Sequence, residues 1–248
     1  MGDQGQRGEW LARHNGNGSR VPCHACHLRT RCAVAAFPAD DLESLKGHVR
    51  ALRPVRRGDT FYRAGEAASR LLIVHAGSAR ISLSRQGGRE MICDYYLPGD
   101  TLGLEALHTG THTATCVALE TTQVCELSRN SLMRLAGRHP DLRERICLQM
   151  NRALVRSQHH QLDIATKSSE QRLAGFLIDV SMRLGERGYS THSYRLPLTR
   201  LEIANHLGMR TETLSRLLAD FRRRGLITLA GREIDLLQRE GLSRLAGD

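Results

Sequence analysis

Short apolar runs separated by turn residues fill residues 40–135. The runs are rich in β-prone side chains, and glycines stand between them, which is typical of strands joined by tight turns. Strands this short and this often interrupted predict an antiparallel barrel or double-sheet roll. A hairpin turn is expected at Gln86–Arg89, between two of the runs. The predicted strands are Thr60–Tyr62, Leu71–His75, Ala79–Ser84, Met91–Tyr96, Thr115–Leu119 and Gln123–Leu127.

An uninterrupted helix is predicted next, from Asp141 to Ser168, with Pro140 at its start. A stripe along it has 3-4-3-4-3 spacing, which is the signature of a coiled-coil seam. We expect this helix to pair with the same helix of a second copy; the alternative is that the stripe packs on its own barrel. Polar side chains at Ser157 and Gln161 lead to the hypothesis of a weak dimer. The predicted dimer-interface residues are Cys147, Met150, Leu154, Ser157, Gln161 and Ile164.

The last third of the chain predicts several shorter helices. A helix is expected over Gln171–Leu184, followed by a loop over Gly185–Ser193. Thr199 and Glu202 have the spacing of a capping box, so a further helix begins there, and Gly208 ends it. This tight turn leads directly into a second helix, so that the two form a helix-turn-helix pair.

The second helix of the pair begins near Thr211 and leaves Glu212, Ser215 and Arg216 on its polar face. These groups suit base edges in the major groove, with arginine on guanine and glutamate on cytosine. A helical hairpin with a solvated charged face has the same pattern. The arginine run and the β-prone segment Leu226–Leu237, with its turn at Gly231, favour a winged helix-turn-helix. The expected phosphate contacts are Thr211, Thr213, Arg222, Arg223 and Arg224.

Charge supports a nucleic-acid partner without proving it. The 248 residues carry a formal charge of +10, but residues 166–248 hold 14 Lys or Arg and 10 Asp or Glu, a net +4. No apolar run in the sequence approaches the length of a membrane span. The first 20 residues, which we expect to be a mobile arm, lack the apolar core of a secretory signal peptide. We therefore expect a cytoplasmic protein. No nucleotide-cradling loop, catalytic triad or paired carboxylates occur, so an enzyme is not expected.

Three cysteines, Cys23, Cys26 and Cys32, are clustered as C-x2-C-x5-C. The total of 7 cysteines is odd, which argues against a complete set of disulfides. Thiolates this close in sequence can converge on a soft metal. Three interpretations stay open from the spacing: an iron–sulfur cluster with a fourth cysteine, a zinc site completed by His24 or His27, and free thiols.

The pattern E-T-x-S-R, at Glu212–Arg216, resembles the recognition helix of the CRP/FNR transcription regulators, and of the FNR branch in particular. The cysteine spacing and the segment A-L-E-T-x-x-V-C-E, at residues 118–126, resemble the same branch. This resemblance implies that Cys125, rather than its rival Cys116, completes a [4Fe–4S] cluster with the three clustered cysteines. Cys93 and Cys147 are expected to be small buried residues.

The resemblance covers nearly the whole chain from Cys23 onward and implies an α+β fold. The implied parts are an N-terminal cysteine-cluster arm, an antiparallel β-roll like that of cyclic-nucleotide-binding domains, a long dimerisation helix and a C-terminal winged helix-turn-helix. The expected boundaries are 1–20 for the mobile arm, 21–135 for the cysteine cluster and roll, 136–166 for the dimerisation helix and 167–248 for the DNA-binding domain.

The implied function is oxygen sensing. Without oxygen, the cluster-loaded homodimer would bind palindromic TTGAT-type promoter sites and recruit or block RNA polymerase. A cyclic nucleotide is not expected, because Leu107–Val117 contains no arginine for its phosphate and only His108 and His112 as basic groups. The alternative function is a DNA-binding regulator of the same fold whose cysteines hold structural zinc or sense redox state.

Overall fold

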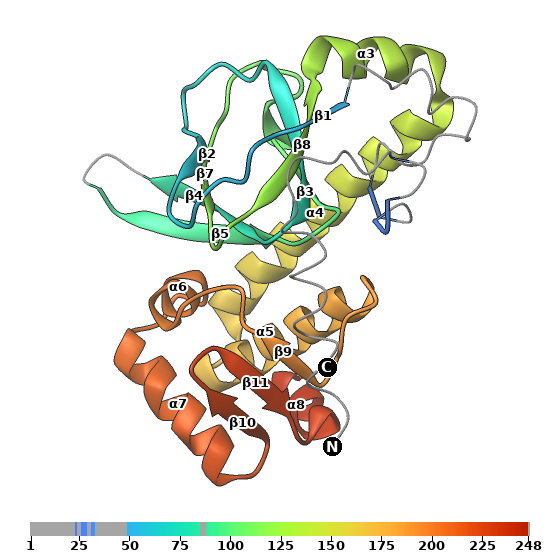
Figure 1. The fold of residues 1–248 in the computed structure, drawn as a ribbon. Helices are drawn as coiled ribbons and strands as arrows, with labels where there is room; N and C mark the ends of the chain where they lie inside the picture. Colours follow the sequence, from blue (N-terminus) through green and yellow to red (C-terminus); the bar gives the residue numbers. More distant parts are fainter. Residues whose placement is uncertain (1–22, 24–25, 29–30, 33–48, 85–87, 248) are drawn as a thin grey trace.

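The computed structural model of the chain describes residues 23, 26–28, 31–32, 49–84 and 88–247. The arm expected at residues 1–20 lies outside them. A β-roll forms one end of the molecule, and the long helix α4 (Pro140–Thr166) runs from it to a smaller domain at the other end (Figure 1). Of the described helices, none is long and apolar enough to cross a membrane.

Two antiparallel sheets of four strands face each other in the roll. Their strand orders are β1-β8-β3-β6 and β2-β7-β4-β5. Side chains on the inner faces of the two sheets form one buried cluster, which includes Val74, Leu102, Cys116 and Val124. The strands are β1 (Val49–Ala51), β2 (Thr60–Tyr62), β3 (Arg70–Ala76), β4 (Ala79–Ser84), β5 (Glu90–Tyr96), β6 (Thr101–Leu102), β7 (Thr115–Ala118) and β8 (Gln123–Ser128).

The roll predicted from the apolar runs is confirmed, and every predicted strand ends within one residue of an observed one. The expected hairpin is present as the β4–β5 pair, which runs from Ala79–Tyr96 to Ser84–Glu90 with a one-residue shift of register between Ile81 and Ser82. Part of its turn, residues 85–87, lies outside the described residues. The short strands β1 and β6 were not predicted, because two or three residues carry too little alternation to be recognised.

A helix that the sequence did not predict, α3 (Arg129–Arg138), lies between the roll and α4. Ser128 caps it, with its Oγ accepting from the backbone N–H of Ser131 at 3.1 Å. The expected boundary of the roll at residue 135 takes in most of this segment, because the amphipathic stretch directly follows the last strand. The helix α4 ends two residues earlier than predicted, since Ser168 is instead the N-cap of α5 (Ser169–Gly185).

The C-terminal domain is a winged helix-turn-helix, as predicted. The capping box of Thr199 and Glu202 opens α6 (Arg200–His206), and α7 (Thr211–Arg223) follows after the turn at Gly208. The wing is formed by β10 (Ile227–Ala230) and β11 (Glu233–Leu236). Two elements here were missed: β9 (Ser193–Arg195), which starts at the end of the predicted loop and pairs with β11, and α8 (Arg239–Ala246).

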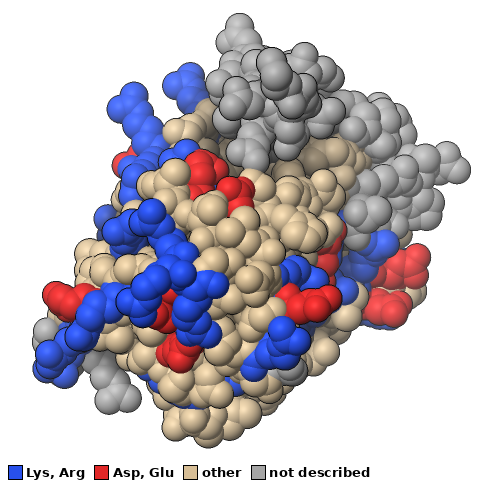
Figure 2. Space-filling view, turned by 90° about the horizontal axis from the view of Figure 1, so that it is seen from below, with Lys and Arg blue, Asp and Glu red and all other residues tan. Residues whose placement is uncertain are grey.

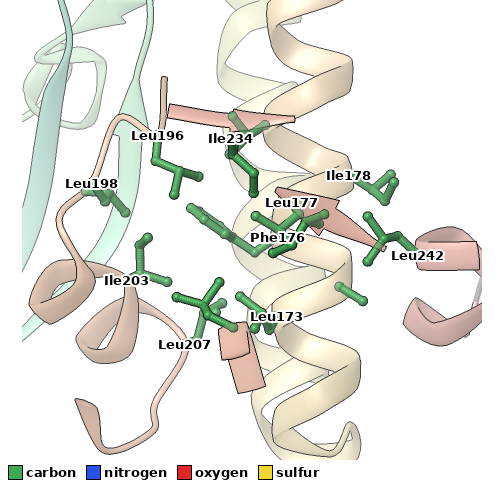
Figure 3. Close-up of a cluster of buried hydrophobic side chains, with 14 of the residues drawn as sticks. Leu173, Phe176, Leu177, Ile178, Leu196, Leu198, Ile203, Leu207, Ile234 and Leu242 are labelled. Atoms are coloured by element: carbon green, nitrogen blue, oxygen red, sulfur yellow. The ribbon is translucent and has the colours of Figure 1, made fainter. Parts of the chain in front are cut away.

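One core holds the C-terminal domain together. Helix α5 is its centre, with Leu173, Phe176 and Leu177 packed among apolar side chains of α6, α8 and the wing (Figure 3). Tyr95 of β5 and Leu97, just after it, belong to the same buried cluster. The roll and the DNA-binding domain are therefore joined by a shared core.

Candidate functional site

Strand β8 places Cys125 on the outer face of its sheet. Successive side chains of a strand point to opposite faces, and Val124 belongs to the buried interior of the roll. Cys125 and Leu127 therefore point outward, where α3 and α4 cover part of the sheet. Cys23 and Cys32 pack against the same apolar cluster as Cys125. The fold thus brings the cysteine motif to the outer face of β8.

Backbone hydrogen bonds form short turns within the cysteine motif. The carbonyl of the buried Leu28 accepts from the backbone N–H groups of Arg31 at 2.9 Å and Cys32 at 2.8 Å. The N–H of Cys26 donates to the carbonyl of Cys23 at 3.3 Å. These bonds connect described residues of the motif (23, 26–28 and 31–32), and we call the segment from Cys23 to Cys32 the cysteine loop.

Burial and the neighbouring thiols of the cysteine loop set the pKa of Cys125. Burial raises this pKa, and the negative charges of Cys32, Cys23 and Cys26 raise it further, to about 12. The pKa of Cys23 is also raised, by burial and then by the charge of Cys26. Both thiols are therefore protonated at neutral pH. A bound cation would favour their thiolates and release protons.

The described residues include no set of three or more His, Cys, Asp or Glu side chains arranged to hold a metal ion. The four thiols thus share a neighbourhood without converging on one point. His75 of β3 lies beside them, with its Nδ1 4.0 Å from the Sγ of Cys26 and its ring 5.5 Å from that of His27. His75 was not predicted as a site residue. The one indication of it in the sequence is a polar residue within an apolar strand. His24 lies outside the described residues.

The remaining cysteines are placed differently from one another. Cys116, the rival fourth ligand, is fully buried inside the roll, where burial raises its pKa. The expectation that Cys147 is buried is wrong in the single chain, because it lies on the exposed side of α4. Cys93 is half-buried rather than buried, because β5 is an edge strand of its sheet.

The segment Leu107–Val117, where no nucleotide is expected to bind, contains a buried histidine. His112 stacks on Tyr62 with 3.6 Å between ring centroids, and its Nδ1 is 2.9 Å from a carboxylate oxygen of Glu105. A carboxylate in this position repels a phosphate. The absence of cyclic-nucleotide binding remains a prediction, and these contacts support it.

The first turns of α4 pack on the roll, and the later turns do not. Leu142 and Ile146 are buried in the cluster beneath α3. Further along, Met150 and Leu154 are 43% and 57% exposed, and Cys147 is exposed as well. The alternative that the stripe packs on its own roll therefore applies only to the beginning of the helix.

The polar seam positions are also on the surface. Ser157 and Gln161 are exposed, and the Nε2 of Gln161 donates to the Oγ of Ser157 at 3.4 Å. Ile164 is half-buried, because it lies against the turn at Gly208 in the DNA-binding domain. Most of the predicted seam is thus open to a partner.

Helix α7 presents the predicted reading face to solvent. Leu214, Leu218 and Phe221 are buried, while Glu212 and Arg216 are exposed. The other predicted contacts near its start, Thr211, Thr213 and Ser215, are half-buried. No side chain caps the helix at Arg210, so its first N–H groups are available to a phosphate.

The arginines of α7 differ in their neighbours. Within the described part of the chain, no carboxylate pairs with Arg216 or Arg222, whereas Asp220 pairs with both Arg223 and Arg224. Viewed from the side of the C-terminal domain, Lys and Arg side chains gather in a band with some Asp and Glu among them (Figure 2). The two unpaired arginines are the better candidates for nucleic-acid contact.

Comparison with known proteins agrees with this architecture. Residues 171–245 match the Crp-like helix-turn-helix domain, and residues 52–139 match the cyclic nucleotide-binding domain. The transcriptional activator protein FnrA of Stutzerimonas stutzeri is 35% identical over 91% of this chain and 92% of its own length. The fumarate and nitrate reduction regulatory protein of Escherichia coli K12 is 31% identical over 96% of this chain and 95% of its own length. The chain belongs to the FNR-type branch of the CRP/FNR family.

Two further relatives extend the family assignment. Electron transport regulator A of Shewanella oneidensis is 33% identical over 94% of this chain and 93% of its own length. The structure of FixK2 from Bradyrhizobium japonicum superposes with a TM-score of 0.73 and 28% identity, covering 79% of this chain and 96% of that one. As a member of the CRP/FNR family, the protein is a DNA-binding transcription regulator rather than an enzyme.

Proposed function

We propose that this CRP/FNR-family protein senses oxygen and binds palindromic TTGAT-type promoter sites as a dimer when its cysteine loop carries a [4Fe–4S] cluster. One observation carries the proposal: Cys23 and Cys32 of the loop pack against the same apolar cluster as Cys125, on the outer face of β8. In a DNA-binding regulator, such a set of thiols is suited to a metal-dependent switch.

The donor chemistry fits the cluster. Cys23, Cys26, Cys32 and Cys125 provide four thiols, the usual number of ligands, and all four are half-buried. Once bound, the cluster would supply iron and sulfide that react with oxygen. The chain itself holds the sulfur atoms, limits the access of water through the apolar cluster around Leu127, and connects the loop to the roll.

We propose that the exposed seam of α4 pairs with that of a second copy. Met150 and Leu154 provide apolar area for this contact, and Cys147 and Ile164 extend it toward each end. The polar pair Ser157 and Gln161 would weaken it. A dimer of limited stability can respond to a small change at the cysteine loop, since a two-state equilibrium shifts most readily when its states are close in free energy.

In the dimer, each α7 would read one half of a palindromic site. Arg216 suits the O6 and N7 atoms of guanine, Glu212 the N4 of cytosine, and Ser215 a less specific contact. Thr211, Thr213 and Arg222 would hold the phosphate backbone. The bound dimer would then recruit or block RNA polymerase.

A second candidate function is a regulator of the same fold with a structural zinc ion or a thiol-redox cysteine set. The observation that favours it is His75, whose Nδ1 is 4.0 Å from the Sγ of Cys26. Thiolates and one imidazole are a common tetrahedral zinc set. In that case the reading helix would keep its role, and air would not change the metal content.

The test is the content of iron, acid-labile sulfide and zinc in protein purified without oxygen and then exposed to air. We expect about four iron and four sulfide per chain, lost in air together with the dimer. About one zinc per chain, unchanged by air, would contradict the oxygen-sensing proposal and support the zinc regulator. Absence of all three would leave thiol chemistry as the function of the cysteines.

A further inference from the structure

Arg31, next to Cys32 in the cysteine loop, contacts three other parts of the molecule. Its Nη2 lies 2.5 Å from Oε2 of Glu186, and its Nε donates to the Glu186 carbonyl at 3.2 Å. Its own carbonyl accepts from Nε2 of Gln149 on α4 at 3.2 Å. Its Cβ lies against Gly99, where an added Cβ would approach it to 2.8 Å. One residue therefore connects the loop to α4, the roll and the C-cap of α5.

The turn that Arg31 touches is also bound by two arginines at the end of α5. Arg187, just after α5, donates through Nε to the carbonyl of Pro98 at 2.7 Å and through Nη2 to Oδ1 of Asp100 at 2.6 Å. Arg183 of α5 donates to Oδ2 of Asp100 at 3.2 Å. The 98–100 turn is thus clamped between the cysteine loop and the first helix of the DNA-binding domain.

Helix α5 can transmit such a contact because its opposite face forms the core of the DNA-binding domain. Leu173 and Leu177 are fully buried among the helices and strands that position α7 (Figure 3). Near its end, the buried Arg183 also donates to the carbonyl of Tyr95 at 2.7 Å. A displacement of the end of α5 would therefore change the angle at which the domain meets the roll.

We propose that Arg31 is a positioning residue that couples the cysteine loop to the DNA-binding domain within one chain. This inference rests on the proposed function and adds a route that does not pass through the dimer seam. Cys32 and Arg31 share a peptide bond, so drawing Cys32 toward a metal group moves the guanidinium that holds Glu186. The planar fork of arginine makes this pairing sensitive to small shifts.

The structure predicts that removing this pair leaves the fold intact. The Glu186 side chain is 52% exposed and that of Arg31 is 19% exposed, so solvent can replace the contact. The effect should instead appear in the coupling between the loop and the DNA. This distinguishes a positioning role from a merely structural one.

The experiment measures DNA affinity of the full chain with the loop loaded with iron and sulfide under nitrogen, and again after metal removal. The ratio of the two affinities is the coupling. We expect Arg31→Ala and Glu186→Gln to lower it about fivefold or more, the scale of typical coupling between two sites. Arg31→Lys should recover only part of it. The matched control is Arg63→Ala, an exposed arginine of the roll, which should leave the ratio unchanged.

A second readout does not depend on DNA. Hydrogen–deuterium exchange at residues 183–189 should differ between the loaded and metal-free wild type, and this difference should disappear in Glu186→Gln. That variant leaves the cysteine loop itself unaltered, so it decides the question even if Arg31→Ala holds less iron.

The outcomes separate the two proposals. A high ratio in the wild type that stays unchanged in both Arg31→Ala and Glu186→Gln overturns the role of Arg31 alone. A wild-type ratio near one, with iron and sulfide bound, overturns the oxygen-dependent switch and the Arg31 coupling with it.

Discussion

Cys125 and Cys116 show how the face of a strand decides the chemistry available to a thiol. Cys116 points into the closed interior of the roll, whereas Cys125 points outward to the cysteine loop. Burial raises the pKa of both, but the loop thiols act on Cys125. A metal bound by the loop can therefore recruit Cys125 without opening the roll.

We predict that Cys125→Ala abolishes most of the iron bound under nitrogen, because one of four thiolate ligands is lost. Cys93→Ala is the matched control, since Cys93 is also half-buried but lies on β5. It should retain the iron content of the wild type. Equal iron content in Cys125→Ala and Cys93→Ala, measured per chain, would show that Cys125 is not a ligand.

Arg216 is predicted to read a base, and Arg222 is predicted to hold a phosphate. Arg216→Ala should cost about 1–3 kcal/mol of binding free energy and relax the preference at one base pair. Arg222→Ala should weaken binding to every sequence and reduce the slope of log affinity against log salt concentration by about one. Binding assays on a set of single-base variants of the TTGAT site distinguish the two. Uniform weakening by Arg216→Ala would refute base reading.

His160 of α4 and His206 of α6 form a stacked pair with 4.2 Å between ring centroids. Burial, and then the charge of His206, lowers the pKa of His160 to about 4, although Asp94 and Asp163 act in the opposite direction. The pKa of His206 is lowered as well, chiefly by burial. The neutral imidazoles are thus the forms that the fold favours.

The stability that His160 contributes should be present above its ordinary pKa of 6.5 and decline as pH falls from there toward about 4. Urea unfolding at a series of pH values measures this. In His160→Gln the decline should be smaller, because one buried group no longer has to take up a proton. Parallel curves for the variant and the wild type would exclude His160 as a source of acid sensitivity.

At the scale of elements, α4 combines two environments in one helix. Its first turns are buried against the roll through Leu142 and Ile146, and its later turns expose an apolar stripe. The 27-residue helix also reaches the DNA-binding domain, where Ile164 meets the turn at Gly208. A change in how α4 pairs with a second copy would therefore act next to the turn that precedes the reading helix α7.

Two kinds of substitution in the seam should change the stability of the dimer in opposite directions. Ser157→Leu should tighten the metal-free dimer, because each buried leucine contributes about 1.5–3 kcal/mol. Leu154→Glu should weaken the loaded dimer, because it would bury a charge. Sedimentation equilibrium measures both effects. The control is Met133→Glu, since Met133 is 53% exposed on α3, outside the seam. If Leu154→Glu and Met133→Glu leave the same dimer constant, the interface lies elsewhere.

At the scale of the whole molecule, partly buried ion pairs join the roll to the DNA-binding domain. Arg183 of α5 lies within salt-bridge distance of Asp94 at 3.4 Å and of Asp100 at 3.2 Å, both on the roll. Arg156 of α4 pairs with the same Asp94 at 3.0 Å. These opposite charges lower the pKa of Asp94 despite its burial. The three parts of the chain thus meet at one charged centre.

Arg183→Met should destabilise the protein by about 1–3 kcal/mol, because Asp94 and Asp100 each lose one of two arginine partners and the carbonyl of Tyr95 loses its buried donor. Chemical denaturation measures the loss. The control is Arg195→Met, whose ion pair with Glu233 is longer, at 3.8 Å, and exposed on both sides; it should cost about 0–1 kcal/mol. Similar losses in the two variants would mean that the charged centre does not hold the domains together.

The sequence by itself determined the features that depend on neighbouring residues. Alternation and helical periodicity located the predicted strands and helices, and the Thr199–Glu202 spacing located a helix start that the structure reproduces. The short elements β1, β6 and β9 and the helices α3 and α8 were missed, because brief patterns are easily assigned to adjacent segments. The cysteine motif and the reading face of α7 were also recognisable, because their residues are close in sequence.

Only the tertiary structure decided which distant residues meet. Sequence spacing cannot tell which face of β8 carries Cys125, or that His75 lies beside Cys26. Arg31 and Glu186 are 155 positions apart, and no local pattern links them. Such contacts depend on the path of the whole chain, because packing of the roll and α5 sets which side chains come within bonding distance.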